Sequence, residues 1–274
     1  MCLNRFIYSF IIILKVCDRS SAEDVTIANT SQRVADVECS KMAALPEFYP
    51  NLFSIYPENG AELSEFPHVV SLGYERVDQK SYDFLCSGSL VSDSFVLTAA
   101  RCVENIMQIR PDIVRVGLIE ISDRTQYDNE TDIKIAEIIR HPSYSRQKLT
   151  HNLALLRLEK PVQFSESVYP ICLYTKGDTS NTTLTATAWS EPESPSRNND
   201  KWLLKENVKT MGLSECRQIF ESYSLRLQIT DEHVCGGDSM PNTRICKNYM
   251  GGSLHNSNYS NRQYQLVGVG SYSR

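Results

Sequence analysis

Residues 95–102 read Phe95-Val96-Leu97-Thr98-Ala99-Ala100-Arg101-Cys102, an apolar, β-branched run that ends in small residues, an arginine and a cysteine. Runs of this composition favour β-strands, and similar short runs alternate with turns on both sides of this stretch. They cover residues 69–72, 89–91, 113–116, 133–139, 153–158, 184–188 and 264–269. This spacing predicts an all-β sandwich or barrel architecture, with a further strand over 203–211 and a short helix over 214–222.

The length and charge of the chain narrow the class of protein. At 274 residues the chain is long enough for one two-lobed domain preceded by a short N-terminal segment. The formal net charge is −5, and the charges are spread through the sequence without a basic stripe. We therefore expect no nucleic-acid partner. No CxxC pair or cluster of histidine and cysteine has zinc spacing, so we expect no metal or other cofactor.

Residues 1–22 have the pattern of a secretory signal peptide. Arg5 precedes an apolar run over residues 6–14, and Ser20-Ser21-Ala22 forms a small-residue cleavage site before Glu23. The run is shorter than the roughly 20 residues that span a bilayer, so we expect no membrane span. The prediction is a secreted, extracellular protein; the alternative is a retained amphipathic or anchor segment.

The cysteines and glycosylation signals agree with an extracellular protein. Removal of residues 1–22 leaves seven cysteines, which predicts a disulfide framework with one odd thiol. Sequons of the form Asn-x-Ser/Thr begin at Asn29, Asn129, Asn181 and Asn258. Together with the signal peptide they predict a glycoprotein.

The stretch 97–102 resembles the segment that reads Leu-Thr-Ala-Ala-His-Cys in the trypsin/chymotrypsin-like serine peptidases. Seven further motifs resemble this family in the same order and spacing. They are Glu65-Phe66-Pro67-His68, Cys86-Ser87-Gly88-Ser89-Leu90, His141-Pro142-Ser143-Tyr144, Asn152-Leu153-Ala154-Leu155-Leu156, Pro170-Ile171-Cys172-Leu173, Thr187-Ala188-Trp189-Ser190 and Gly251-Gly252-Ser253-Leu254. The resemblance covers residues 55–274 and implies two antiparallel six-stranded β-barrels with the site between them. Residues 23–54 then form a light-chain-like linker.

The resemblance assigns the catalytic triad to Arg101, Asn152 and Met250, in place of histidine, aspartate and serine. A guanidinium stays protonated and cannot accept a proton, and a thioether has no proton to lose. Asn152 is neutral and could not stabilise an imidazolium. The resemblance therefore implies a degenerate triad without peptidase activity. His151 does not rescue the base, because neighbouring residues on a strand point to opposite faces.

Other family positions also differ. Asn248 stands for the oxyanion-hole glycine, and Tyr249 stands for the aspartate that pairs with the freed N-terminus after activation. Ile55-Tyr56-Pro57-Glu58 replaces Ile-Val-Gly-Gly, and Pro57 fixes φ where the family uses glycine. Arg244 lies where trypsin-type members hold an acid; it either binds an acidic side chain or extends to solvent.

The resemblance also implies a disulfide pattern. Cys86 pairs with Cys102, Cys216 pairs with Cys235, and Cys39 pairs with Cys172 as in clip-type arthropod serine proteases. Cys246 is left without a partner. Ser271-Tyr272-Ser273 takes the place of Ser-Trp-Gly, after which the family adds a last strand and a helix. We therefore expect a second barrel that is incomplete at the C-terminus, from a truncated product or from a molecule that closes its edge in another way.

The resulting hypothesis is a secreted, non-catalytic serine protease homologue. It would bind or regulate a component of an extracellular protease cascade, such as those of arthropod innate immunity and melanisation. The partner would be an extracellular protease, a zymogen or a microbial surface. The alternatives are an atypical or residual serine-type endopeptidase and a fragment without a stable fold.

Overall fold

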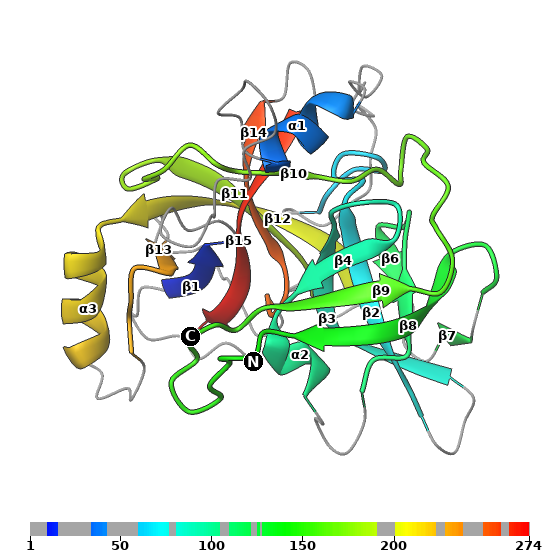
Figure 1. Cartoon of the computed structure of the whole chain (residues 1–274), viewed down its shortest axis with the longest axis horizontal. Helices are drawn as coiled ribbons and strands as arrows, with labels where there is room; N and C mark the ends of the chain where they lie inside the picture. Colours follow the sequence, from blue (N-terminus) through cyan, green and yellow to red (C-terminus); the bar gives the residue numbers. More distant parts are fainter. Residues whose placement is uncertain are drawn as a thin grey trace.

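The computed structural model places most strands in two antiparallel barrels that lie side by side (Figure 1). It describes residues 10–15, 34–42, 60–76, 81–104, 110–121, 125–126, 128–190, 201–222, 228–237, 249–258 and 263–273. The predicted all-β fold with two barrels is confirmed. We refer to the ring built from residues 69–158 as the first barrel and to the other ring as the second barrel.

Six strands that follow one another closely in sequence close the first barrel in the order β2-β5-β8-β9-β4-β3, with β3 returning to β2. They are β2 (Val69–Glu75), β3 (Ser81–Leu90), β4 (Phe95–Thr98), β5 (Ile113–Arg115), β8 (Asp132–Arg140) and β9 (Ala154–Leu158). The short strand β7 (Thr125–Gln126) pairs with β3. Alternating apolar side chains fill the interior, and Leu72, Leu90, Ile113 and Leu156 are wholly buried.

The second barrel takes five strands from the later part of the chain and one from the beginning. The later strands are β11 (Thr183–Ser190), β12 (Lys201–Met211), β13 (His233–Gly237), β14 (Ser253–Asn258) and β15 (Gln263–Ser273). The sixth place, between β13 and β15, is held by β1 (Phe10–Lys15). The ring is therefore closed although its C-terminal part supplies only five of its strands. Two short strands attach to it: β10 (Cys172–Leu173) on β15 and β6 (Glu120–Ile121) on β12.

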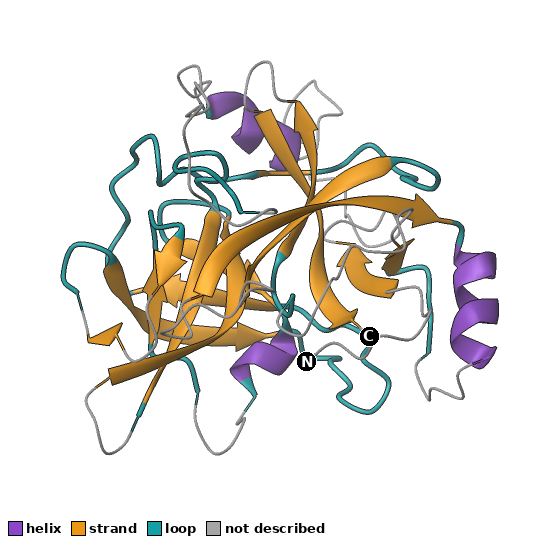
Figure 2. Ribbon diagram, turned by 180° about the vertical axis from the view of Figure 1, so that it is seen from behind, coloured by secondary structure: helices purple, strands orange, loops and turns teal. Residues whose placement is uncertain are grey.

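Three helices accompany the barrels. Helix α3 (Leu213–Ser222) stands at the outer side of the second barrel, away from the first (Figures 1 and 2). Helix α2 (Ala100–Val103) directly follows β4 and carries Arg101. Helix α1 (Val34–Lys41) lies in the predicted linker and is fixed to β10 by the disulfide between Cys39 and Cys172. The Thr175 hydroxyl adds a hydrogen bond of 2.5 Å to the Asp36 carboxylate.

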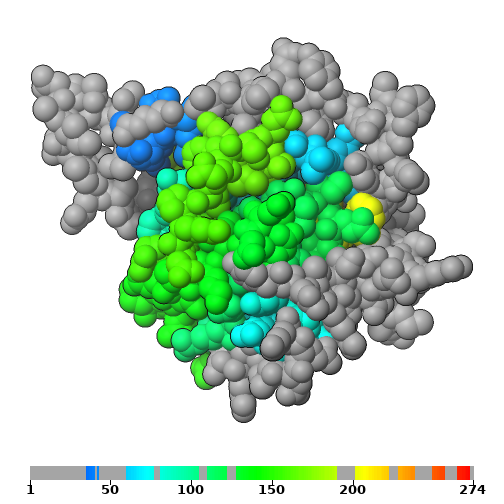
Figure 3. All heavy atoms as spheres, turned by 90° about the vertical axis from the view of Figure 1, so that its right-hand side faces the viewer, coloured from blue at the N-terminus to red at the C-terminus, as the bar shows by residue number. Residues whose placement is uncertain are grey.

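After a turn of 90°, residues of the first barrel, in cyan and green, lie at the surface, with α1 in blue at the upper left (Figure 3). Within the described parts of the chain, no helix has both the length and the apolar character needed to cross a membrane. The same residues contain no group of three or more His, Cys, Asp and Glu side chains arranged to hold a metal ion.

Candidate functional site

The side chain of Asn152 joins the two barrels at the centre of the candidate site. Asn152 is completely buried at the entry to β9, after a turn in which Leu149 and His151 adopt positive φ. Its Oδ1 accepts a hydrogen bond of 2.8 Å from the Arg101 backbone N–H, and its Nδ2 donates one of 2.8 Å to Ser271 Oγ in β15. The amide thus uses both its acceptor and its donor, and a carboxylate at this position would have no donor to offer.

Arg101 lies on α2 and follows the buried residues Ala99 and Ala100 in sequence. Arg101 itself is half-buried. Nearby, the Tyr144 hydroxyl donates to Glu104 Oε2 at 3.3 Å. Burial and then Glu104 raise the pKa of Tyr144 to about 12, while the positive charge of Arg101 acts in the opposite direction. The Arg101 guanidinium has no lone pair with which to accept a proton.

Met250 sits in a turn of closely packed backbone. Its carbonyl accepts a hydrogen bond of 3.0 Å from Ser87 N, and its half-buried side chain packs against the main hydrophobic core. Gly251 has φ +77°, and a Cβ there would lie 2.1 Å from Ser87 O. Its N–H donates to Gly270 O at 2.8 Å. Met250-Gly251-Gly252 therefore forms a tight turn that requires glycine at position 251, and the first residue of this turn, Met250, has a thioether side chain.

Tyr249 is buried inside the second barrel, where it packs with Val208, Leu254 and other apolar side chains. Burial, with a smaller contribution from Glu206, raises the pKa of its hydroxyl far above the ordinary value. The residue is neutral at any physiological pH. An aromatic ring thus occupies the position that the resemblance assigns to a buried carboxylate.

A second cluster of serine and histidine side chains lies at the interface of the barrels. Ser253 Oγ is 3.1 Å from His255 Nδ1 and 3.4 Å from His68 Nε2, and it also contacts Thr187 Oγ1 at 2.5 Å. Burial, followed by the neighbouring His255, lowers the pKa of His68, and burial lowers the pKa of His255 to about 3. Ser253, His68 and His255 are each at most 1% exposed. The cluster has the residue types of a nucleophile and its base, but no substrate can reach it in this conformation.

His151 precedes Asn152 in sequence, but the side chains of the two residues have different partners. Its Nε2 lies 2.8 Å from Glu232 Oε1, and its ring stacks on His141 with centroids 4.8 Å apart. His151 lies in a turn with φ 53° rather than on a strand, so the expected strand alternation is not what separates the two side chains. The left-handed backbone turns His151 toward Glu232, while Asn152 faces Arg101 and Ser271.

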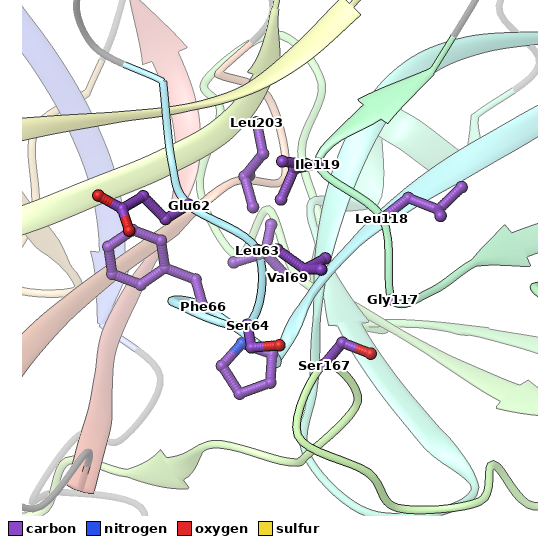
Figure 4. Close-up of a pocket in the computed structure, with 11 residues that line it drawn as sticks. Glu62, Leu63, Ser64, Phe66, Val69, Gly117, Leu118, Ile119, Ser167 and Leu203 are labelled. Atoms are coloured by element: carbon purple, nitrogen blue, oxygen red, sulfur yellow. The ribbon is translucent and has the colours of Figure 1, made fainter. Parts of the chain in front are cut away.

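The pocket in Figure 4 lies away from these residues, where the segment 62–69 meets the first barrel and the loop at Ser167. Phe66, Val69, Leu118, Ile119 and Leu203 give it apolar walls. Its space is about 220 Å³, part of which is open solvent. Pockets for small ligands usually measure about 300–1,000 Å³, so this one is too small to carry a function by itself.

The three disulfides that the sequence analysis expects are present. They join Cys86 to Cys102, Cys216 to Cys235 and Cys39 to Cys172. The sequons at Asn129 and Asn181 begin in exposed turns, and Asn258 ends β14. Asn29, Arg244, Cys246, Asn248 and the segment 54–58 lie outside the described residues.

Residues 56–274 match the trypsin family. The chain belongs to this family. Serine protease snk of Drosophila melanogaster is 31% identical over 194 residues, which cover 69% of this chain and 44% of that protein. Coagulation factor XI of Bos taurus is 29% identical over 215 residues, or 76% of this chain and 32% of the relative. CLIP domain-containing serine protease B4 of Anopheles gambiae is 25% identical over 225 residues, or 77% of this chain and 60% of the relative.

The chain thus spans less than two thirds of the length of each of these relatives. Arg101 follows β4, Asn152 precedes β9 and Met250 precedes β14. Asn152 bonds to Ser271 and the Met250 carbonyl bonds to Ser87 N of the facing barrel, whereas the Arg101 backbone N–H bonds to Asn152 within the first barrel.

Proposed function

We propose that this protein is a secreted, non-catalytic member of the trypsin family that binds or regulates a component of an extracellular protease cascade. The observation that carries the proposal is the environment of Asn152. Its amide bonds Arg101 on one side and Ser271 on the other, with no imidazole in the contact. In this proposal, Asn152 joins the barrels through Ser271, and none of the three assigned triad positions moves a proton.

The chemistry of the three side chains supports the loss of catalysis. A serine peptidase needs a hydroxyl that attacks, a base that takes its proton and a group that orients the base. Met250 supplies no hydroxyl, Arg101 supplies no base, and Asn152 supplies no charge. In subtilisin, loss of the triad costs roughly a factor of 2 × 10⁶ in turnover, and we expect an effect of that order here.

The clip-type and cascade character rests on the relatives and on one disulfide. Two of the relatives are named as a CLIP domain-containing protease and a coagulation factor. The Cys39–Cys172 bond keeps α1 attached to the trypsin-like domain. We expect the partner to be an extracellular protease, a zymogen or a microbial surface, and the process to be innate immunity or melanisation.

The test compares the protein with a restored variant. The secreted protein and an Arg101→His/Asn152→Asp/Met250→Ser variant are treated with a fluorophosphonate probe and with peptide esters. We expect no labelling and no hydrolysis above background for the natural sequence. Met250→Ser alone should also fail, because Arg101 still cannot act as a base.

An atypical endopeptidase is the alternative outcome of this experiment. Hydrolysis by the natural sequence that disappears in a Met250→Ala variant would establish that outcome and end the pseudoenzyme proposal. The triple variant serves only to show whether the remaining scaffold can still catalyse. Its activity or inactivity does not bear on the natural protein.

A further inference from the structure

Three arginines gather around one tyrosine at the edge of the candidate site. The Arg140 guanidinium lies 5.9 Å from the centre of the Tyr144 ring. The Tyr144 hydroxyl donates to Glu104 Oε2 at 3.3 Å, and Arg146 Nε lies 3.6 Å from the same oxygen. Arg101 lies one helical turn before Glu104, and the charges of Arg101 and Arg146 act against the rise in the pKa of Tyr144 that burial and Glu104 cause. We call Arg101, Arg140, Arg146 and Tyr144 the arginine cluster.

The Arg101 guanidinium has no acidic partner among the residues that the structure describes. It forms no hydrogen bond or ion pair with any of them, whereas Glu104, the carboxylate nearest to it along the chain, is already engaged within the cluster. Glu232 of the second barrel lies 2.8 Å from His151 Nε2. Arg101 is half-buried, so it offers a recessed positive charge that an incoming carboxylate can neutralise.

The backbone of Arg101 is held in place by contacts within the chain. Its N–H donates to Asn152 Oδ1 at 2.8 Å, and the buried Asn152 side chain is fixed on its other side by Ser271. Helix α2 also packs against β8, the strand that ends in Arg140. A site whose backbone is already ordered loses less conformational entropy when it binds a ligand.

The residue types and exposure of the cluster favour the carboxylates of a peptide. A guanidinium presents a planar fork of N–H groups that binds a carboxylate through two parallel bonds. Arg140 is exposed and the Arg146 side chain is 73% exposed, so both can turn toward an acidic side chain beside the one at Arg101. Sulfated polysaccharides are typically bound by runs of lysine and arginine, and no such run accompanies the cluster.

We infer that the arginine cluster is the site at which this protein binds an acidic segment of a partner protein. Arg101 pairs with one side-chain carboxylate of that segment, and Arg140 or Arg146 pairs with a neighbouring one. Tyr144 adds no negative charge at physiological pH, because burial and then Glu104 raise its pKa to about 12. The inference rests on the proposed binding function and specifies the chemistry of the partner.

The test measures peptide binding to the secreted protein by fluorescence anisotropy. The probe is a labelled peptide of sequence Gly-Glu-Glu-Gly-Glu-Glu-Gly. The matched control peptide has glutamine in place of each glutamate, so it keeps the size and hydrogen-bonding groups and loses the charge. We expect the glutamate peptide to bind with 1:1 stoichiometry, at least about 10-fold more tightly than the glutamine peptide. Added salt should weaken the binding.

Variants of single arginines locate the binding on the cluster. Arg101→Gln should weaken it about 10-fold, and Arg146→Gln about 3-fold because this side chain is more exposed. Arg101→Lys keeps the charge but loses the fork, so its affinity should lie between those of Arg101→Gln and the natural sequence. Arg157→Gln removes the same charge from an exposed pair on β9 and should leave the affinity unchanged. Arg140→Gln, also about 3-fold weaker, and Arg146→Gln keep the test decisive if Arg101→Gln folds poorly.

Three results would overturn the inference. One is equal binding of the glutamate and glutamine peptides, or no binding of either. Another is a loss of affinity in the three cluster variants that does not exceed the loss in Arg157→Gln. The third is binding of heparin, but not of the glutamate peptide, that the cluster variants abolish, because the ligand would then be a polysaccharide. Labelling by the fluorophosphonate probe is measured separately, so the arginine cluster and the loss of catalysis can fail independently.

Discussion

The two barrels solve the same problem of closure with different parts of the chain. The first barrel closes with strands that all lie between residues 69 and 158. The second is closed by β1, which lies more than 200 residues before the strands it joins. A barrel built from one continuous segment can form from local contacts, whereas the second depends on a strand that must be supplied from elsewhere. The first barrel is therefore the self-sufficient half of the molecule.

The interface between the barrels is polar at two points and apolar around them. Asn152 bonds across it to Ser271, and the rings of His68 and His255 meet across it with centroids 5.0 Å apart. Because His68 and His255 are buried, protonation of either ring would place an uncompensated charge at this interface.

The largest effect should come from acid acting on the two buried histidines. Burial lowers the folded-state pKa of both His68 and His255 below the ordinary 6.5, so below pH 6.5 the unfolded chain binds protons that the folded chain does not. Stability is then independent of the pair well above pH 6.5. Below it, His255, whose pKa burial lowers to about 3, removes about 1.4 kcal/mol of stability per pH unit, and His68 acts in the same direction. Urea unfolding at pH 6.5 and pH 4.5 should differ by about 2 kcal/mol from His255 alone, and by more with His68.

A variant separates the histidines from the carboxylates that also titrate in acid. His255→Leu should roughly halve the slope between pH 6.5 and pH 5.5, where most carboxylates are still ionised. An unchanged slope in this variant would show that the buried pair is not the source of the acid sensitivity. The surviving structure at low pH should be the first barrel, which hydrogen exchange can establish.

The buried ion pair of the first barrel should give the next largest effect. Arg115 and Asp132 are 2% and 0% exposed and form two bonds of 2.5 and 2.6 Å, and the guanidinium also lies 4.6 Å from the centre of the Phe84 ring. Arg115→Ala leaves the carboxylate buried without this partner, which typically costs about 3–5 kcal/mol. Arg157→Ala removes an exposed pair with Glu137 and should cost less than about 1 kcal/mol.

Denaturant unfolding of both variants checks this prediction. If Arg115→Ala lost no more stability than Arg157→Ala, the first barrel would not depend on its buried pair. If hydrogen exchange in Arg115→Ala showed faster exchange only for amides of the second barrel, the second barrel would be the half that limits stability in both variants.

A glycine pair tests the turn that carries Met250. Gly251→Ala forces a side chain onto a backbone with φ +77° and a Cβ to 2.1 Å from Ser87 O, so we expect a loss of about 3 kcal/mol. Gly212→Ala, which meets no atom within 4 Å, should leave stability nearly unchanged. Thermal unfolding of the two variants measures the difference. Equal melting temperatures would show that the turn yields without cost.

The sequence predicted the first barrel better than the second, for a physical reason. Most strands of the first barrel are runs rich in β-branched and aliphatic residues, whose composition alone predicts a strand. They are β2, β4, β5, β8 and β9. Strands β13 and β14 read His-Val-Cys-Gly-Gly and Ser-Leu-His-Asn-Ser-Asn, and their glycines and polar residues conceal them. Their pairing partners, rather than their own propensities, make them strands.

The role of β1 could not be read from composition, because a signal peptide and a buried strand are both short apolar runs. The same limit applies to the short helix α1 in the predicted linker, which is fixed by a disulfide that the resemblance did imply. The positions of Arg101, Asn152 and Met250 came from motif order. The contact from Asn152 to Ser271 did not, because it joins residues 119 positions apart.

The smallest expected effect concerns Asn152 itself and decides whether its amide is required. Asn152→Ala leaves the Arg101 N–H and the Ser271 hydroxyl without a buried partner and should cost about 2 kcal/mol. Asn152→Asp keeps an acceptor for Arg101, and the Ser271 hydroxyl can rotate to donate to the carboxylate, so the cost should be below about 1 kcal/mol. Denaturant unfolding at pH 7.5 compares the two. Equal losses would mean that the donor of the amide is indispensable, and that the position has become committed to joining the barrels and no longer accepts the acidic residue of a working triad.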